Sequence, residues 1–120
     1  MSVILVVDDN PLNLELTCVT LQMGGHETLT ATNGREAIAV VSVTEPDLIL
    51  MDLRMPVLDG KLAMEAIKAD ERKRHIPIVV LTASAMKGER EHLLQCGFDG
   101  YIDKPIDVTR FSETVAEYLK

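Results

Sequence analysis

Three short apolar runs along the chain predict buried β-strands. Each is four or five residues long and rich in β-branched or large aliphatic side chains, and none alternates with polar residues; the runs cover residues 3–7, 48–51 and 78–81. This pattern is typical of strands that are covered on both faces in a parallel sheet. Two further segments are weaker candidates for strands. Residues 28–32 alternate and therefore indicate an edge strand, and Tyr101-Ile102 is a short fifth candidate.

Helix signals lie between and after these strands. Asn10 before Pro11 predicts an N-cap and a first helical residue, and Gly24-Gly25 predicts the end of that helix. Further helices are predicted after the turn at residues 33–34, over about 60–70, over 87–96, and from residue 107 onward. Apolar stripes predict the buried faces of four of them: Leu14, Cys18 and Leu21; Ala37, Ile38 and Val41; Leu62, Ala63, Ala66 and Ile67; and Phe111, Val115 and Leu119.

The alternation of strand and helix, repeated five times, predicts an α/β fold. Parallel strands need long crossovers, and the intervening segments are long enough for helices. We therefore expect one domain over residues 1–120, built as a single open five-stranded parallel sheet with helices on both faces. No linker, repeat or low-complexity tract interrupts the pattern.

Composition narrows the classes of function. The 120 residues include 12 Lys and Arg against 19 Asp and Glu, a net charge of −7, which disfavours general binding to nucleic acid. No apolar run approaches the roughly 20 residues of a membrane span, and no secretory signal is present. The two cysteines form no disulfide framework. We expect a cytoplasmic protein without membrane or nucleic-acid partners.

Some polar residues are expected to have only structural roles. The three histidines, at positions 26, 75 and 92, are scattered and predict no transition-metal site. The basic stretch over residues 68–74 precedes the fourth strand, at the end of the sheet opposite the expected site. We interpret it as a solvated helix end that the helix dipole favours.

Polar residues that could carry chemistry follow the predicted strands. Ligand sites in open α/β sheets lie beyond the carboxyl ends of the strands. Asp8 and Asp9 follow the first strand, Asp52 ends the third, and Thr82 and Lys104 follow the fourth and fifth. Each alone also has a structural explanation: a helix cap or turn for an aspartate, a strand-end hydroxyl for the threonine, a solvated surface amine for the lysine.

As a group, the three carboxylates predict a cation site, which none of them predicts alone. Clustered carboxylates repel one another unless a cation neutralises them, and oxygen ligands without His or Cys favour a hard cation such as Mg²⁺. An aspartate beside Mg²⁺ and a lysine can act as a nucleophile on a phosphoryl group and form an aspartyl phosphate. The sequence therefore predicts phosphoryl transfer to an aspartate.

The chain resembles the receiver domain of two-component response regulators over its whole length. The segments that carry the resemblance are Val6-Val7-Asp8-Asp9-Asn10, Leu50-Met51-Asp52-Leu53-Arg54-Met55-Pro56 with Asp59-Gly60, Val80-Leu81-Thr82-Ala83, and Tyr101-Ile102-Asp103-Lys104-Pro105. Each is weak alone, but together and in order they are very specific. The resemblance implies the flavodoxin-like (βα)5 fold with strand order 2-1-3-4-5.

The same resemblance implies roles for individual residues. Asp52 would accept the phosphoryl group, and Asp8, Asp9, Asp52 and the backbone carbonyl of Arg54 would bind Mg²⁺ or Mn²⁺. Lys104 would contact the phosphoryl group, with a cis bond to Pro105. Thr82 and Tyr101 would change position together on phosphorylation: the Thr82 hydroxyl would move toward the phosphoryl group and the Tyr101 ring would turn inward. The small Ala83 would leave room for the phosphoryl group. Phosphorylation would then change the surface of the fourth helix, fifth strand and fifth helix.

The resemblance also implies partners: a histidine kinase or histidine phosphotransfer protein, and a downstream protein target. Residues 9–13 and 85–88 are similar to segments of phosphorelay receivers in hybrid kinases and of stand-alone receivers. The first helix would dock a helical hairpin that bears the phospho-histidine, through Leu12, Leu16, Val19 and Met23 on its outer face. The alternative, that some of these pack against the fifth helix, stays open.

Other interpretations of the same residues stay open. The chain fits either a complete protein or a receiver domain from a larger hybrid histidine kinase. A Mg²⁺-dependent aspartyl-phosphate phosphatase would place a DxD pattern after the first strand, where Asp8 and Asp9 are adjacent. Flavodoxin-like electron transfer would need a phosphate loop there. We therefore expect a phosphorylated signalling domain and no enzyme beyond its own phosphorylation and slow dephosphorylation.

Overall fold

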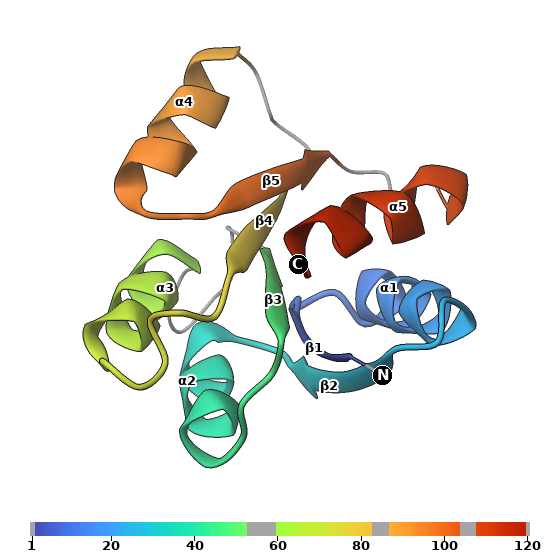
Figure 1. Ribbon diagram of the computed structural model, residues 1–120, viewed down its shortest axis with the longest axis horizontal. Helices are drawn as coiled ribbons and strands as arrows, with labels where there is room; N and C mark the ends of the chain where they lie inside the picture. Colours follow the sequence, from blue (N-terminus) through green and yellow to red (C-terminus); the bar gives the residue numbers. More distant parts are fainter. Residues whose placement is uncertain (1, 53–59, 83–86, 104–107, 120) are drawn as a thin grey trace.

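The computed structural model describes residues 2–52, 60–82, 87–103 and 108–119. Strands and helices alternate through this part of the chain (Figure 1). The elements are β1 (Val3–Val7), α1 (Pro11–Met23), β2 (Glu27–Ala31), α2 (Gly34–Val43), β3 (Leu48–Asp52), α3 (Gly60–Ala69), β4 (Ile78–Thr82), α4 (Lys87–Cys96), β5 (Gly100–Asp103) and α5 (Val108–Tyr118). The predicted fivefold alternation is confirmed.

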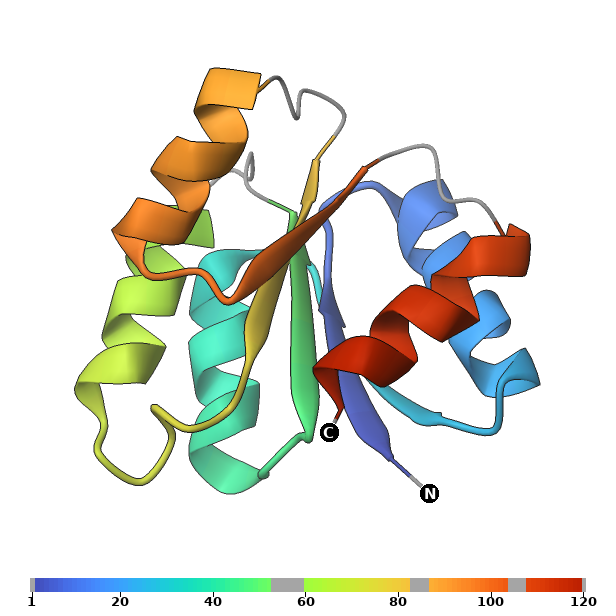
Figure 2. The same ribbon diagram turned by 45° about the horizontal axis from the view of Figure 1, so that its top comes forward.

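The five strands form one parallel sheet in the order β2-β1-β3-β4-β5. The register pairs Val7 with both Ala31 and Met51, and Asp52 with Leu81. All carboxyl ends therefore lie at one edge of the sheet, at the top of Figure 2. The predicted class and strand order are confirmed, and the alternating strand β2 lies at an edge as expected.

Helices cover both faces of the sheet, α1 and α5 on one side and α2, α3 and α4 on the other (Figures 1 and 2). The strands divide their side chains between these faces by alternation. Leu5, Val7, Ile49 and Met51 belong to the core beneath α2, α3 and α4, while Ile4, Val6, Leu48 and Leu50 belong to the core beneath α1 and α5. Each such side chain contributes about 2 kcal/mol by burial.

Local signals set the ends of the helices. The Asn10 side chain accepts hydrogen bonds from the backbone N–H groups of Leu12 and Asn13 at 3.0 and 3.1 Å, so α1 begins as predicted. Asn33 is the N-cap of α2 and accepts from Glu36 N–H at 2.9 Å, so the predicted turn is also the start of this helix. Gly97 ends α4 with φ of 119°, a backbone conformation that favours glycine.

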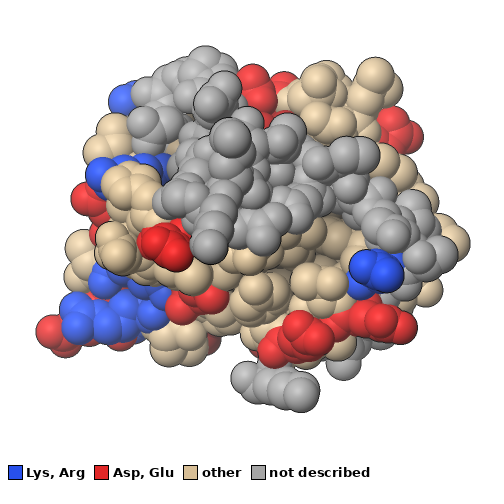
Figure 3. Space-filling view, turned by 90° about the horizontal axis from the view of Figure 1, so that it is seen from above, with Lys and Arg blue, Asp and Glu red and all other residues tan. Residues whose placement is uncertain are grey.

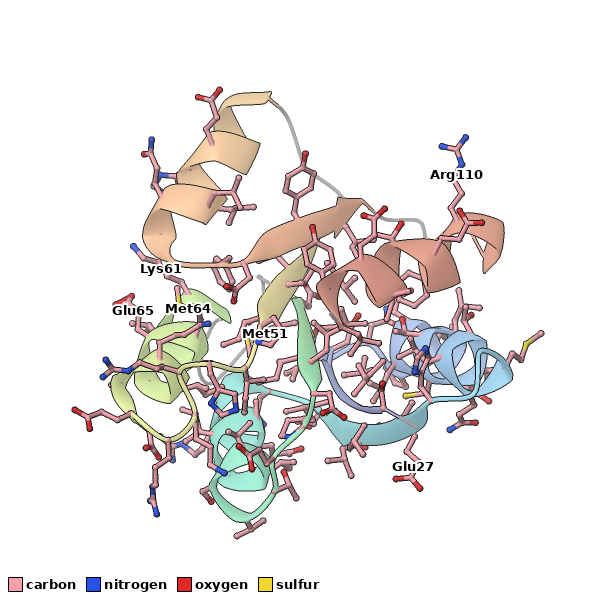
Figure 4. The ribbon with its side chains drawn as sticks, viewed as in Figure 1. Glu27, Met51, Lys61, Met64, Glu65 and Arg110 are labelled. Carbon is pink, nitrogen blue, oxygen red and sulfur yellow. The ribbon has the colours of Figure 1, made fainter. Side chains whose placement is uncertain are left out.

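The predicted buried face of α3 is wrong in part. Ala63 and Ile67 are buried, but Leu62 is 51% exposed and Ala66 is also exposed. Gly60 and Met64 take their place, so the buried stripe follows the spacing i, i+3, i+4, i+7. Figure 4 shows Lys61 and Glu65 on the outer side of α3, which fits this orientation. None of the described helices is long and apolar enough to span a bilayer.

The basic stretch before β4 is only partly solvated. Arg72 and Arg74 are exposed, as expected, but the Lys68 side chain is 22% exposed. Its ammonium group donates to the carbonyls of Arg74 and Ile76 at 3.1 and 3.0 Å and to the Asp99 carboxylate at 2.9 Å. Lys68 therefore ties α3 to the segments that precede β4 and β5, and the prediction that it is solvated is wrong.

Candidate functional site

Three aspartates meet at the carboxyl edge of the sheet. Asp8 and Asp9 follow β1, and Asp52 is the last residue of β3, the strand beside it. One carboxylate oxygen of each lies within 4.8 Å of the others. The predicted convergence of these three residues is therefore confirmed, and it results from parallel neighbouring strands that end at the same level.

Local hydrogen bonds fix Asp8 within this cluster. Its backbone N–H donates to the carbonyl of Ala31 at 3.1 Å, which extends the pairing of β1 with β2 by one residue. Its carboxylate Oδ1 accepts from Asn10 N–H at 2.9 Å. The Asp8 side chain is thus oriented by the turn into α1 and is 1% exposed. Asp9 is exposed and Asp52 half-buried, so the cluster opens from a buried base toward solvent.

The donor set fits a hard divalent cation. Three carboxylates concentrate negative charge, and a cation among them would remove the repulsion. The cluster consists of carboxylate oxygens, which Mg²⁺ prefers, and Mg²⁺ keeps several waters where the protein supplies few ligands. Separations up to 4.8 Å exceed the roughly 4.2 Å between opposite ligands of Mg²⁺ by about half an ångström, which small side-chain movements supply.

The other predicted site residues are described only in part. Thr82 ends β4, where its backbone pairs with Asp103, so it lies at the same edge as Asp52; its side chain lies outside the described part of the structure. Tyr101 is half-buried in β5 and packs against the core beneath α2, α3 and α4. Arg54, Ala83, Lys104 and Pro105 lie outside the described residues.

The outer face of α1 carries a continuous apolar stripe. Leu12, Leu16, Val19 and Met23 follow the spacing i, i+4, i+7, i+11 and are 76%, 46%, 46% and 77% exposed. The opposite side of the helix buries Cys18 and Leu21 in the core shared with Phe111 and Val115 of α5. All four side chains therefore reach the surface, and the alternative that some of them pack against α5 stays a prediction.

One residue near the switch position was not predicted. The ring and hydroxyl of Tyr118, at the end of α5, occupy the space where a Cβ at Gly100 would lie. Burial raises the pKa of the Tyr118 phenol, and a hydrogen bond from the backbone N–H of Tyr101 lowers it to a smaller extent. Tyr118 thus holds α5 against β5 directly beside Tyr101. In the sequence, only Gly100, directly before Tyr101, indicates that another side chain approaches the backbone closely at this point.

Surface charge of both signs surrounds the described part of the site. On the face seen from above in Figure 3, most Lys and Arg side chains gather at the left, while Asp and Glu side chains occur on both sides. Arg110, at the outer end of α5 in Figure 4, is exposed. The described residues of this face therefore form no continuous basic surface of the kind that nucleic-acid binding needs.

Comparison with known proteins agrees with the geometry. The family model of the response regulator receiver domain matches residues 4–116. The polar-differentiation response regulator DivK of Brucella anthropi is 42% identical over 116 residues, which cover 97% of this chain and 94% of DivK.

Two solved structures extend the comparison. The receiver domain of a sensor histidine kinase from Pseudomonas aeruginosa, with a magnesium ion coordinated in its active-site cleft, superposes with a TM-score of 0.90 at 36% identity and covers 98% of this chain and 97% of its own. The chemotaxis response regulator CheY4 of Vibrio cholerae superposes with a TM-score of 0.93 at 29% identity and covers 99% of both chains. The chain therefore belongs to the response regulator receiver domains and has a phosphoacceptor role in two-component signalling.

Proposed function

We propose that Asp52 is the residue that accepts the phosphoryl group, in a Mg²⁺ site formed with Asp8 and Asp9. The observation that carries this proposal is the convergence of the three carboxylates within 4.8 Å at the ends of β1 and β3. Asp8 is buried and held by Asn10, which suits a metal ligand, whereas Asp52 is half-buried and offers an oxygen to an incoming group. The magnesium in the solved sensor-kinase receiver supports the choice of cation.

The chemistry follows from these positions. A carboxylate oxygen of Asp52 attacks the phosphorus of a phosphorylated histidine; the O–P bond forms as the P–N bond breaks, and the leaving imidazole takes up a proton. Mg²⁺, when bound, neutralises charge on the transferring oxygens. Asp8 and Asp9 would hold the cation. Mn²⁺ has the same preference for oxygen ligands and would serve as well.

The remaining contacts at the site are proposed from the family pattern. The Arg54 carbonyl would complete the protein ligands to the metal, and Lys104, before a cis bond to Pro105, would pair with the phosphoryl group. Thr82 would hydrogen-bond the phosphoryl group, with Ala83 leaving it room. Tyr101, half-buried in β5, would move with the Thr82 hydroxyl and change the surface of α4, β5 and α5 for a downstream protein.

We propose the apolar stripe of α1 as the docking surface for the phosphodonor. Receiver domains interact with histidine kinases or phosphotransfer proteins, and Leu12, Leu16 and Met23 are exposed along α1, a helix that begins at Pro11, shortly after Asp8 and Asp9 in the chain. An amphipathic helix can bury such a stripe. Residues 1–120 would act as one receiver domain, in a stand-alone regulator or in a hybrid histidine kinase.

The acceptor is tested by phosphorylation with acetyl phosphate and Mg²⁺, measured as the gain of one phosphoryl group in intact mass. The wild type should be labelled, Asp52→Asn should not, and EDTA should abolish labelling. Asp70→Asn is the matched control, because Asp70 is a partly exposed carboxylate at the opposite end of the sheet. Equal labelling of Asp52→Asn and the wild type would show that the acceptor is another residue.

A further inference from the structure

A histidine and a cysteine lie one turn apart on α4. His92 Nε2 is 3.6 Å from Cys96 Sγ, and the two residues stand at i and i+4. His92 is exposed and Cys96 half-buried, while Leu93 between them is buried in the core. The pair therefore lies where α4 meets the core: the His92 side chain is in solvent, and Cys96 packs partly against the core beneath α2, α3 and α4. Figure 1 shows α4 on the outside of the molecule, beside the β5 edge of the sheet.

The separation of the two atoms matches that of two ligands on one zinc ion. With Zn–S of about 2.3 Å and Zn–N of about 2.0–2.1 Å, tetrahedral geometry places sulfur and nitrogen about 3.6 Å apart. The observed Sγ···Nε2 distance is 3.6 Å. In the absence of metal, the same separation lets the thiol donate to the ring nitrogen, so the side chains already hold the geometry that a metal requires.

Electrostatics at this position also favours a cation. Cys96 is the last residue of α4, and the carbonyl end of a helix carries partial negative charge. Thiolate and imidazole are ligands that zinc prefers and Mg²⁺ does not. The three aspartates and this pair are therefore suited to different metals and would not compete for the same ion.

We propose that His92 Nε2 and Cys96 Sγ bind Zn²⁺ as a two-ligand chelate on the surface of α4. The thiol loses its proton to solvent when the Zn–S bond forms, and water occupies the two remaining positions. The scattered histidines predicted no transition-metal site, but His92 and Cys96 stand one helical turn apart on α4. The site lies on α4, one of the elements of the proposed downstream surface, so bound zinc would alter that surface.

The test uses Co²⁺ as a spectroscopic substitute for Zn²⁺ in the full chain. Co²⁺ bound to a thiolate gives an intense sulfur-to-cobalt charge-transfer band in the near ultraviolet, which an aspartate site cannot produce. The wild type should develop this band and lose it when Zn²⁺ is added. Cys96→Ser should abolish the band, and His92→Gln should weaken Co²⁺ binding about 100-fold, because one helix no longer supplies two ligands.

Control variants test whether another cysteine or histidine, and not His92 and Cys96, gives the cobalt band. Cys18 is 8% exposed, and His75 precedes β4 with its Nε2 at 3.1 Å from Glu45 Oε1, so Cys18→Ala and His75→Gln should leave the band unchanged. Zn²⁺ should also slow alkylation of Cys96 in the wild type but not in His92→Gln. A wild type without the band in excess Co²⁺, or a band that survives Cys96→Ser, would overturn the proposal. Phosphorylation of both pair variants should stay normal, so the two proposals fail independently.

Discussion

Among the described residues, the two ends of the β-sheet bring charged side chains together in different combinations. At the amino end, the Asp99 carboxylate accepts from Lys68 Nζ at 2.9 Å and from Ile78 N–H at 2.8 Å, and Lys68 also donates to two backbone carbonyls. At the carboxyl end, three carboxylates lie within 4.8 Å of one another. Of the described residues, one end joins a lysine to an aspartate and the other brings three aspartates together.

The difference separates a stabilising arrangement from a reactive one. A network in which donors and acceptors are matched holds segments in place, here α3 and the segments before β4 and β5. Carboxylates brought this close repel one another, and a bound cation would reduce that repulsion, so metal binding should add to the stability of the folded chain. Changes at the amino end should therefore lower stability and leave phosphorylation intact, whereas changes to the three aspartates at the carboxyl end should alter metal binding and phosphorylation.

The largest effect on stability is expected at Gly100, at the amino end of β5. Gly100→Ala should lower the free energy of unfolding by about 3 kcal/mol, because the new methyl group meets the ring of Tyr118. Urea unfolding measures this loss. In a Tyr118→Leu background the same substitution should cost less than about 1 kcal/mol, since the ring is gone. An equal cost in both backgrounds would show that the close contact is not the cause.

A smaller loss is expected from Lys68. Lys68→Met keeps the aliphatic stem but removes three hydrogen bonds, so the free energy of unfolding should fall by about 2 kcal/mol. Lys61→Met, an exposed position on the same helix, is the control and should change it by less than about 0.5 kcal/mol. Loss of acetyl phosphate labelling in Lys68→Met while it remains folded would break the separation between the two ends.

At the carboxyl end, removing a charged group should raise the free energy of unfolding instead of lowering it. Without Mg²⁺, Asp9→Asn should raise the free energy of unfolding by up to about 1 kcal/mol, because an exposed like charge leaves the cluster. Thermal unfolding with and without Mg²⁺ measures both terms. Mg²⁺ should stabilise the wild type, by about 2.7 kcal/mol at 100 times its dissociation constant, and should stabilise Asp9→Asn much less. Equal stabilisation of both proteins would argue against Asp9 as a ligand.

The smallest effect on the free energy of unfolding is expected for Glu36, a carboxylate at the carboxyl end of the sheet that has a structural role. Hydrogen bonds from the backbone N–H of Thr32 at 3.0 Å and from its hydroxyl at 2.9 Å lower the pKa of Glu36 below its usual 4.5. A lowered pKa in the folded state stabilises the fold above pH 4.5, and this contribution is lost as the pH falls through the folded value. The slight advantage of wild type over Glu36→Gln should therefore vanish in acid, as urea unfolding across pH would show.

Much of the fold could be predicted because its signals are local. Buried parallel strands need continuous apolar runs, and residues 3–7, 48–51 and 78–81 supplied them. The cap at Asn10 and the glycine at 97 define helix ends through their own backbone geometry. The buried face of α3 was misjudged because Leu62 is apolar but exposed, whereas the less obvious Met64 lies against Gly97, 33 positions later in the chain.

The site was predictable for a different reason. Parallel strands end at one edge, so residues that follow them meet even when they are far apart in sequence, as Asp8 and Asp52 do. Contacts between side chains of different helices and strands left no comparable pattern in the sequence. The partnership of Lys68 with Asp99 and the position of Tyr118 over Gly100 required the packed structure.

The most direct test of the central proposal locates the phosphorylated residue itself. Borohydride reduces an aspartyl phosphate to homoserine, and peptide mass spectrometry then identifies the converted position. After treatment with acetyl phosphate and Mg²⁺, homoserine should appear at position 52 and nowhere else, and EDTA should prevent its formation. Homoserine at position 8 or 9, or at position 52 without Mg²⁺, would contradict the account of Asp52 as the acceptor in a metal-dependent carboxylate site.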